Sequence, residues 1–129
     1  MSRMVTHWTV CYDAADPQRL ARFWAAALGY VDEPGYDFAD GASLIDPAGT
    51  LPAISFLKVP EGKTAKNRVH LDIRVAGQGP VDPAVREQRI RAKVTELVAA
   101  GATAVREESY GELSHIVMLD LEGNEFCVA

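Results

Sequence analysis

Two stretches of the sequence decide the fold, and they share one layout. Residues 16–29 read DPQRLARFWAAALG, and residues 82–101 read DPAVREQRIRAKVTELVAAG. Each opens with aspartate and proline, which are favoured at the N-cap and first turn of a helix, and each closes with glycine, which suits the left-handed residue that ends one. Because apolar residues recur between them every three or four positions, the sequence predicts two amphipathic helices, the first over about residues 17–28.

Predicted strands surround both helices in the same order. One β-prone run precedes the first helix and three short runs follow it, at residues 5–12, 29–32, 42–45 and 53–59. The second half repeats this order, with runs at residues 68–75, 103–107, 115–119 and 125–129. The turn Asp120-Leu121-Glu122-Gly123 also stands where Asp46-Pro47-Ala48-Gly49 stands in the first half. We therefore predict an internal duplication, with two β-α-β-β-β modules at about 5–59 and 67–129.

These modules predict an α+β fold with an internal cavity. The length of 129 residues suits a single domain. One face of each sheet is left uncovered by the module's own helix, so the two modules are expected to associate and enclose that face. The predicted architecture is a pair of curled mixed sheets around a central cavity, which is the candidate pocket.

Charge and composition narrow the classes of partner. Thirteen basic and eighteen acidic residues give a net charge of −5, which disfavours nucleic acid and anionic lipid surfaces. The start of the chain lacks an apolar signal segment, and no run is apolar for the length of a membrane span, so we expect a cytoplasmic protein with no membrane partner. Cys11 and Cys127 form no closely spaced pair, and both are interpreted as free thiols.

Several predicted strands carry polar side chains on one face. In residues 68–75 apolar and polar residues alternate strictly, which places Val69 and Leu71 on the helix side and His70 and Asp72 on the opposite face. That opposite face lines the cavity or, as the alternative, is a solvated face or a ladder of ion pairs. The first and last strands add further pocket candidates, which are Thr9, Cys11, Glu125 and Cys127.

The segment that joins the two halves is basic. Lys58, Lys63, Lys66 and Arg68 concentrate positive charge there, which suits either an anionic ligand or a soluble connector. A phosphate-binding loop is excluded at Gly62-Lys63-Thr64, because Leu57 stands where that motif needs a glycine. Common hydrolase and zinc-protease motifs are also missing from the sequence.

Four segments resemble those of actinobacterial glyoxalase-like domain proteins of the vicinal oxygen chelate (glyoxalase/bleomycin resistance/dioxygenase) superfamily. They are residues 16–24, 59–63, 66–72 and 120–128, and together they extend over nearly the whole chain. The resemblance implies two modules whose strands curl around a central cavity, often within a homodimer. It leaves the function open, because the superfamily includes lyases, isomerases, dioxygenases, thiol transferases that inactivate antibiotics, and proteins that sequester a drug.

Metal-dependent members of this superfamily hold a divalent ion with His, Glu or Gln side chains on the first and last strand of each module. The resemblance puts four residues at these positions, namely Thr9, Ser55, His70 and Cys127. Only His70 is a ligand of that kind, so we predict no metal and no other cofactor. The alternative is a two-residue shift of the end strands, which would bring His7, His70 and Glu125 together around a divalent transition metal.

The predicted function is the binding of a small organic molecule in a metal-free cavity, in a resistance or carrier role. His70 is expected to be the polar anchor, and three aromatic residues are candidate apolar walls, namely Trp8, Trp24 and Tyr36, although Trp24 also suits the core. The alternative is an enzyme of the same superfamily, a lyase, isomerase or dioxygenase. It would use His70 as a general acid or base oriented by Asp72 or Glu125, or would depend on a metal.

Overall fold

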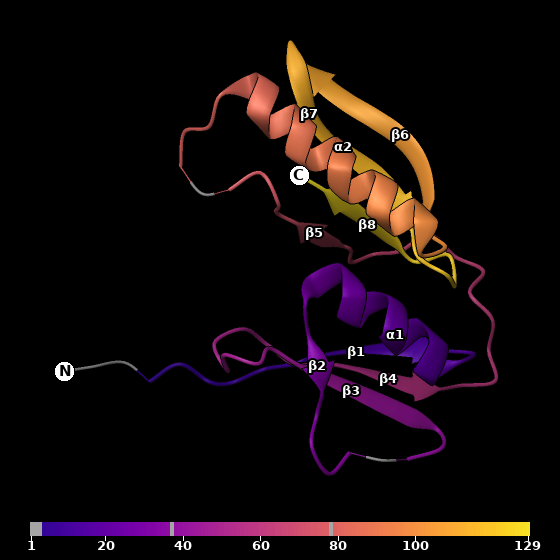
Figure 1. Ribbon diagram of the computed structural model, residues 1–129. Helices are drawn as coiled ribbons and strands as arrows, with labels where there is room; N and C mark the ends of the chain where they lie inside the picture. The colour runs from indigo at the N-terminus through magenta and orange to yellow at the C-terminus, as the bar shows by residue number, and fades with distance from the viewer. Residues whose placement is uncertain (1–3, 37, 78) are drawn as a thin grey trace. The chain divides into compact units, whose positions relative to one another are not determined.

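The computed structural model describes residues 4–36, 38–77 and 79–129. It divides the chain into two compact units, Met1–Gly62 and Lys63–Ala129 (Figure 1). The described residues of each unit form one helix and one four-stranded sheet. Within the described ranges, no helix is both long enough and apolar enough to cross a membrane.

The first unit has the element order that the sequence predicts. Strand β1 (Val10–Ala14) leads into helix α1 (Pro17–Leu28), which is followed by β2 (Val31–Asp32), β3 (Gly41–Ile45) and β4 (Ile54–Lys58). In the sheet the strands lie in the order β1-β4-β3-β2, with β1 parallel to β4 and the other neighbours antiparallel. The sheet is therefore mixed.

The second unit repeats the first. Strand β5 (Leu71–Ile73) and helix α2 (Pro83–Ala99) are followed by β6 (Thr103–Tyr110), β7 (Glu112–Leu119) and β8 (Glu125–Val128). The sheet order is β5-β8-β7-β6, again with one parallel pair, β5 with β8. Two β-α-β-β-β modules with mixed sheets and an α+β architecture are thus confirmed.

The capping residues lie where the sequence predicts the helix ends. The Asp16 carboxylate accepts a hydrogen bond from the Arg19 backbone N–H at 3.2 Å, and the Asp82 carboxylate accepts one from Ala84 N–H at 2.8 Å. Gly29 ends α1 with a φ of 73°, in the left-handed region. The first helix is confirmed at both ends, because these signals act within a few residues of one another.

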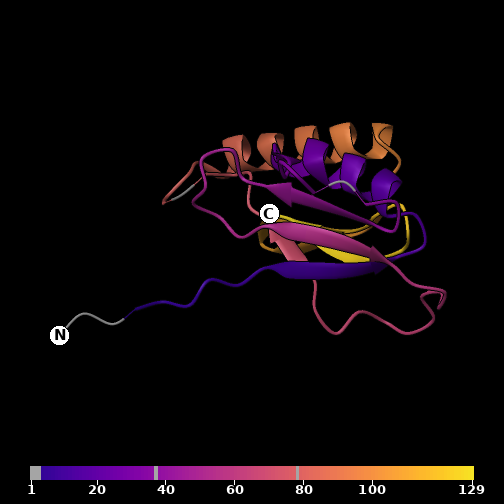
Figure 2. The same ribbon diagram turned by 90° about the horizontal axis from the view of Figure 1, so that it is seen from below.

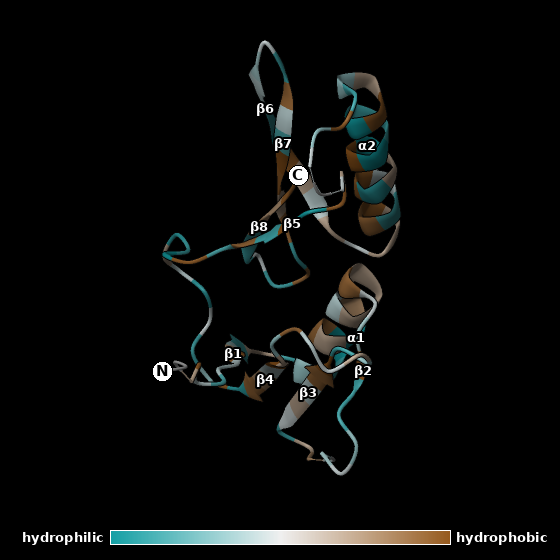
Figure 3. Ribbon diagram, turned by 90° about the vertical axis from the view of Figure 1, so that its left-hand side faces the viewer, coloured by the Kyte–Doolittle hydropathy of each residue, from teal (hydrophilic) through white to brown (hydrophobic). Residues whose placement is uncertain are grey.

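Each sheet packs one face on its own helix, as the strands and helices of Figure 2 show. The fully buried side chains include Leu20, Trp24, Leu44 and Phe56 in the first unit and Ile90, Leu97, Met118 and Phe126 in the second. In Figure 3, α2 alternates between hydrophilic and hydrophobic colours along its length, as expected of a helix with one buried side. The opposite face of each sheet has no cover from that unit's own helix.

Two strands that begin the units differ from their predicted bounds. β1 starts at Val10 rather than at residue 5, because its parallel partner β4 starts at Ile54, which is paired with Val10. β5 is three residues long, because in its sheet it pairs only with the short strand β8. Val69 therefore lies outside the strand and is 76% exposed, and its predicted place on the buried face is wrong.

Strands β6 and β7 are longer than predicted. They form an antiparallel hairpin joined at Gly111, which has a φ of 81°, and they pair from Thr103–Leu119 to Tyr110–Glu112. Apart from the buried Leu113, the added residues at the hairpin tip are mostly polar and give no clear alternation. Backbone pairing between the two strands extends the ladder where side-chain pattern alone does not predict it.

Candidate functional site

The uncovered face of the second sheet carries a row of four paired residues. Asp72 on β5 pairs with Cys127 on β8, Cys127 pairs with Val117 on β7, and Val117 pairs with Arg106 on β6. Paired residues of neighbouring strands point to the same face of a sheet. The intervening residues, such as Leu71 and Phe126, point to the opposite face, towards α2. We call the face that carries the row the polar face.

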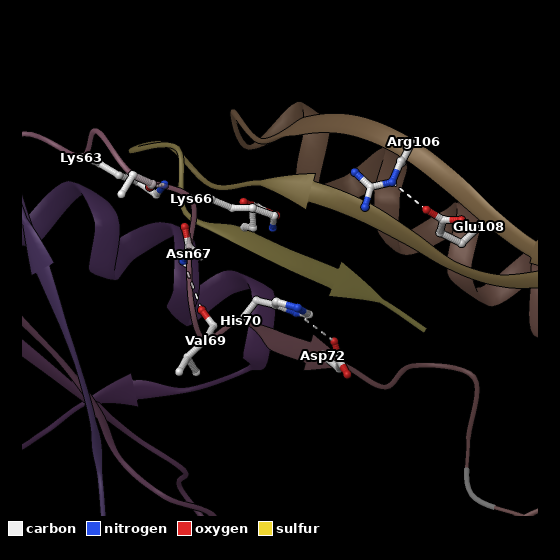
Figure 4. Close-up of polar contacts among 10 residues, drawn as sticks. Lys63, Lys66, Asn67, Val69, His70, Asp72, Arg106 and Glu108 are labelled. Carbon is white, nitrogen blue, oxygen red and sulfur yellow. Dashed lines mark hydrogen bonds and ion pairs between the residues drawn. The ribbon is translucent and has the colours of Figure 1, made fainter.

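His70, Asp72 and Cys127 form a compact cluster at one end of the polar face. His70 immediately precedes β5, and its Nδ1 lies 3.6 Å from Oδ1 of Asp72 (Figure 4). One ligand atom from each of the three side chains lies within 4.8 Å of the other two. The imidazole and the carboxylate are 45% and 60% exposed, whereas Cys127 is buried. The cluster therefore offers two accessible polar groups above a buried thiol.

Burial keeps the Cys127 thiol protonated. Loss of solvent is the largest cause that raises the pKa of Cys127, and the negative charge of Asp72 and a hydrogen bond with it raise the pKa further. The nucleophilic form of cysteine is the thiolate, so this sulfur is poorly suited to attack a ligand at neutral pH. The sequence makes Cys127 a pocket candidate. With its thiol protonated, Cys127 can act only as a small apolar side chain with a weak S–H donor.

We predict that the two thiols react at very different rates with a disulfide reagent. Cys11 is exposed and Cys127 is buried with a raised pKa, so Cys127 should react more than roughly tenfold more slowly than Cys11 at pH 7.5. Absorbance of released thionitrobenzoate from the native protein measures both phases. Cys11→Ser should remove the fast phase and leave the slow one; a fast phase that survives this substitution would contradict the assignment.

Glu125 is held by the connector that enters the second unit. Its Oε2 accepts a hydrogen bond from Lys66 Nζ at 2.6 Å, and its side chain is only 17% exposed. That hydrogen bond is the largest cause that lowers the pKa of Glu125; the charges of Lys66 and Lys63 and the backbone N–H of Asn67 act in the same direction. Glu125 is thus an ionised, paired carboxylate, and these contacts suit a structural role better than the role of a free acid or base.

Asn67, whose backbone N–H contacts Glu125, has a buried side-chain oxygen whose hydrogen-bonding capacity is unsatisfied. Its Nδ2 donates to the carbonyl of Val69 at 3.2 Å, and its Oδ1 is buried with no hydrogen-bond partner among the described residues. Buried acceptors of this kind usually find a donor, in water or in a ligand.

Arg106 and Glu108 belong to the polar face and were missed by sequence reasoning. Arg106 Nε donates to Glu108 Oε1 at 2.6 Å (Figure 4). This hydrogen bond is the largest cause that raises the pKa of Arg106, and Glu125 and Cys127 also contribute, which places the guanidinium near both. The available signal was the i, i+2 spacing of the two charges at the end of a predicted strand, which puts them on one face.

The first unit carries an equivalent row without the titratable cluster. Cys11 on β1 pairs with Ser55 on β4, and Ser55 pairs with Ser43 on β3. By position in the two sheets, Ser55 corresponds to Cys127, and Thr9 just before β1 corresponds to His70 just before β5. These are the equivalences that the repeated turns predict.

The other candidates of the first unit lie outside this row. His7 precedes β1 and is exposed, and Trp8 is 62% exposed. Trp24 is fully buried between the rings of Tyr12 and Phe23, with centroids 5.9 Å and 5.5 Å away, and this burial supports its interpretation as a core residue. Tyr36 packs edge-on against Phe38 at 4.9 Å.

Metal binding at the polar face depends on which donor set is considered. Of the four positions that the resemblance assigns to metal ligands, Thr9 and Ser55 offer only hydroxyl groups, which do not fit a transition metal. Within the second unit, His70, Asp72 and Cys127 offer an imidazole, a carboxylate and a thiol, a donor set that does fit zinc. Asp72 is not one of the four assigned positions. All three residues of this zinc-compatible set therefore belong to the second unit.

Comparisons with known proteins support one family. The model of the glyoxalase-like domain family matches residues 9–129. No curated protein matches the chain in sequence. Among solved structures, an enzyme of the glyoxalase/bleomycin resistance protein/dioxygenase family from Burkholderia phytofirmans is similar with a TM-score of 0.71 and 19% identity, covering 93% of this chain and 94% of that one.

Two further solved structures share the fold with different activities. The fosfomycin resistance protein FosX from Mesorhizobium loti has a TM-score of 0.60 and 12% identity, with 99% and 91% of the two chains covered. The oxidase ChaP-H2 has a TM-score of 0.63 and 16% identity, with 98% and 93% covered. At such identities the similarity establishes the fold of the chain and not its activity.

Proposed function

Because the chain belongs to the glyoxalase-like domain family, we propose that it binds a small organic molecule on the polar face of its second sheet without a metal ion. The observation that carries this proposal is the His70–Asp72–Cys127 cluster, which sets two accessible polar groups beside the buried residues Cys127 and Val117. Small-molecule sites combine an apolar surface with a few polar groups that orient the ligand in this way.

His70 is the polar anchor of this proposal. Its Nδ1 faces Asp72, so the carboxylate favours the tautomer that carries the proton on Nδ1 and leaves Nε2 as an acceptor. Within the described residues Nε2 has no protein partner. The role is that of a carrier or resistance protein that binds and releases its ligand unchanged, in a protein for which we also expect a homodimer.

The proposal predicts that His70→Gln weakens ligand binding about tenfold, which corresponds to the loss of one oriented hydrogen bond. Isotope-labelled protein would be titrated with a panel of small organic compounds, 6-hydroxy-2-naphthamide among them, while backbone amide shifts are recorded. Binding should saturate at one equivalent per chain and shift the amides of Asp72, Val117 and Cys127.

His7→Gln is the matched control, because His7 is exposed and lies before β1, and it should bind as the unchanged protein does. Shifts confined to other parts of the chain, or equal affinity of the His70→Gln and His7→Gln proteins, would contradict the proposal. Conversion of the ligand to a product would replace it with the enzymatic alternative, in which His70 works as general acid or base.

A second candidate function is metal-dependent catalysis, and the same cluster favours it. His70, Asp72 and Cys127 would hold zinc, which would act as a Lewis acid on an oxygen atom of the bound molecule. Metal analysis of freshly purified, untagged protein separates the two candidates. About one mole of zinc per chain, lost in Cys127→Ala, would favour the enzyme. A ratio near zero would support the metal-free site.

A further inference from the structure

We propose that Arg106 binds an anionic group of the ligand, so that the natural ligand is an elongated organic anion with a carboxylate or phosphate at one end. This inference rests on the proposed function, because it concerns the same polar face. It adds a specificity-determining residue and a chemical class of ligand.

The register of the sheet brings Arg106 onto the polar face. Arg106 and Asp72 occupy the two ends of the four-residue row, with Cys127 and Val117 between them. Neighbouring strands lie about 4.8 Å apart, so the backbones at the two ends of the row are about 14 Å apart. The Arg106 guanidinium lies close enough to Cys127 to be affected by its charge, and it therefore reaches inward along the row. A molecule of roughly 10 Å lying across the strands can then span from the His70 end to the guanidinium. Val117, which lies between Cys127 and Arg106 in the row, is apolar.

The hydrogen bonds of Arg106 leave its terminal nitrogens available. Glu108 accepts from Nε, and among the described residues neither Nη atom has a hydrogen-bond partner. In Figure 4 the two Nη atoms point away from Glu108. Two parallel N–H donors at the end of a planar guanidinium match the two oxygens of a carboxylate or phosphate. Glu108 thus holds the guanidinium at Nε, while the edge formed by the two Nη atoms stays open to a ligand.

The charges at the other end of the row give the ligand its direction. Asp72 lies beside His70, and its carboxylate would repel a second anion placed there. At the Arg106 end, Lys66 neutralises Glu125 and Arg106 itself offsets the charge of Glu108, so no uncompensated carboxylate among the described residues faces the ligand there. An anionic group is therefore favoured at Arg106, and a hydroxyl or carbonyl group at His70.

Two probes of the same size test this inference. 6-Hydroxy-2-naphthoate carries a carboxylate at one end and a hydroxyl at the other, and 6-hydroxy-2-naphthamide replaces the carboxylate with a neutral amide. Amide-shift titrations should give an affinity for the naphthoate at least about tenfold above that for the naphthamide, because hydrogen bonds to charged groups are the stronger ones. Arg106→Gln should abolish this preference, because it lowers the affinity for the naphthoate more than the affinity for the naphthamide.

Two further variants control for charge and for geometry. Arg91→Gln removes the same charge from α2, where Arg91 is bonded to Glu107 through both Nη atoms at 2.9 Å, and it should keep the preference. Arg106→Lys keeps the positive charge but lacks the planar guanidinium with its two parallel N–H donors. This variant should therefore retain only part of the preference for the naphthoate.

The outcomes separate this inference from the proposed function. Equal binding of both probes on the polar face, or a preference that survives Arg106→Gln, would overturn the role of Arg106 and leave small-molecule binding standing. If Arg91→Gln also removed the preference for the naphthoate, the preference would come from the net charge of the protein, and this result too would overturn the role of Arg106. No shift on the polar face with either probe at millimolar concentration would count against both proposals.

Discussion

Phe126→Ala is expected to lower the free energy of unfolding by about 3–5 kcal/mol, the range measured when a buried aromatic side chain is truncated. Phe126 is fully buried at the centre of the second sheet, where it pairs with Leu71 on β5 and with Met118 on β7. Its loss leaves a cavity between the sheet and α2 that close-packed neighbours fill only in part. Urea denaturation followed by far-ultraviolet circular dichroism measures the change.

Tyr110→Ala is the control for this prediction. Tyr110 is in the same unit at the tip of the β6–β7 hairpin and is 77% exposed, so its truncation should change the stability by less than about 0.5 kcal/mol. Both tryptophans belong to the first unit, so tryptophan fluorescence follows that unit and does not report the packing around Phe126. Similar losses for Phe126→Ala and Tyr110→Ala would contradict the packing of the second unit.

Asp120→Ala is expected to destabilise the protein by about 3 kcal/mol, because it removes a buried acceptor that serves several donors at once. The Asp120 carboxylate accepts from the backbone N–H groups of Glu122 and Asn124, at 2.9 Å and 3.0 Å, and from Nδ2 of Asn124. Asp120 is 4% exposed, so water does not readily take the place of its carboxylate. Urea denaturation measures the loss, and Asp120→Asn should lose less.

Asp46 in the first module is the matched control for Asp120. Its carboxylate accepts from Ala48, Thr50 and Leu51 in the same kind of turn, but solvent reaches it, so Asp46→Ala should cost less than Asp120→Ala. A larger loss at Asp46 would contradict the role assigned to burial.

The Asp46 contribution should also depend on pH. Hydrogen bonds, first that from Ala48 N–H, lower the pKa of Asp46 below 3.8. A lowered pKa in the folded state gives stability that is present above pH 3.8 and lost as the pH falls through the folded value. The stability difference between the unchanged protein and Asp46→Ala should therefore shrink below that pH.

The two sheets of this chain show how one backbone arrangement carries different side-chain chemistry. On the polar face, the backbone register is set by the sheet, while the chemistry depends on a few side chains, here His70, Asp72, Cys127 and Arg106. The equivalent row of the first unit has Cys11, Ser55 and Ser43 in a similar register. The two units thus have similar strand pairing, and among the described residues only the second carries the cluster of His70, Asp72 and Cys127.

The sequence by itself determined the features that depend on neighbours along the chain. Asp16 and Asp82 with their prolines, and the glycine at position 29, predict helix ends because capping acts within one turn. The two Asp-x-x-Gly turns predict the repeat for the same reason, since Asp46 and Asp120 bond the backbone a few residues ahead. The order of elements in both modules followed from these signals.

Only the tertiary structure decided the features that depend on pairing between distant strands. β5 and β8 are more than fifty residues apart, and their register places Asp72 beside Cys127. The length of β5, the exposure of Val69 and the position of Arg106 all follow from such pairing, in which a shift of one residue would turn every side chain to the other face. Local propensity carries no information about that register, so the sequence makes His70 and Asp72 candidate site residues but does not single out Arg106.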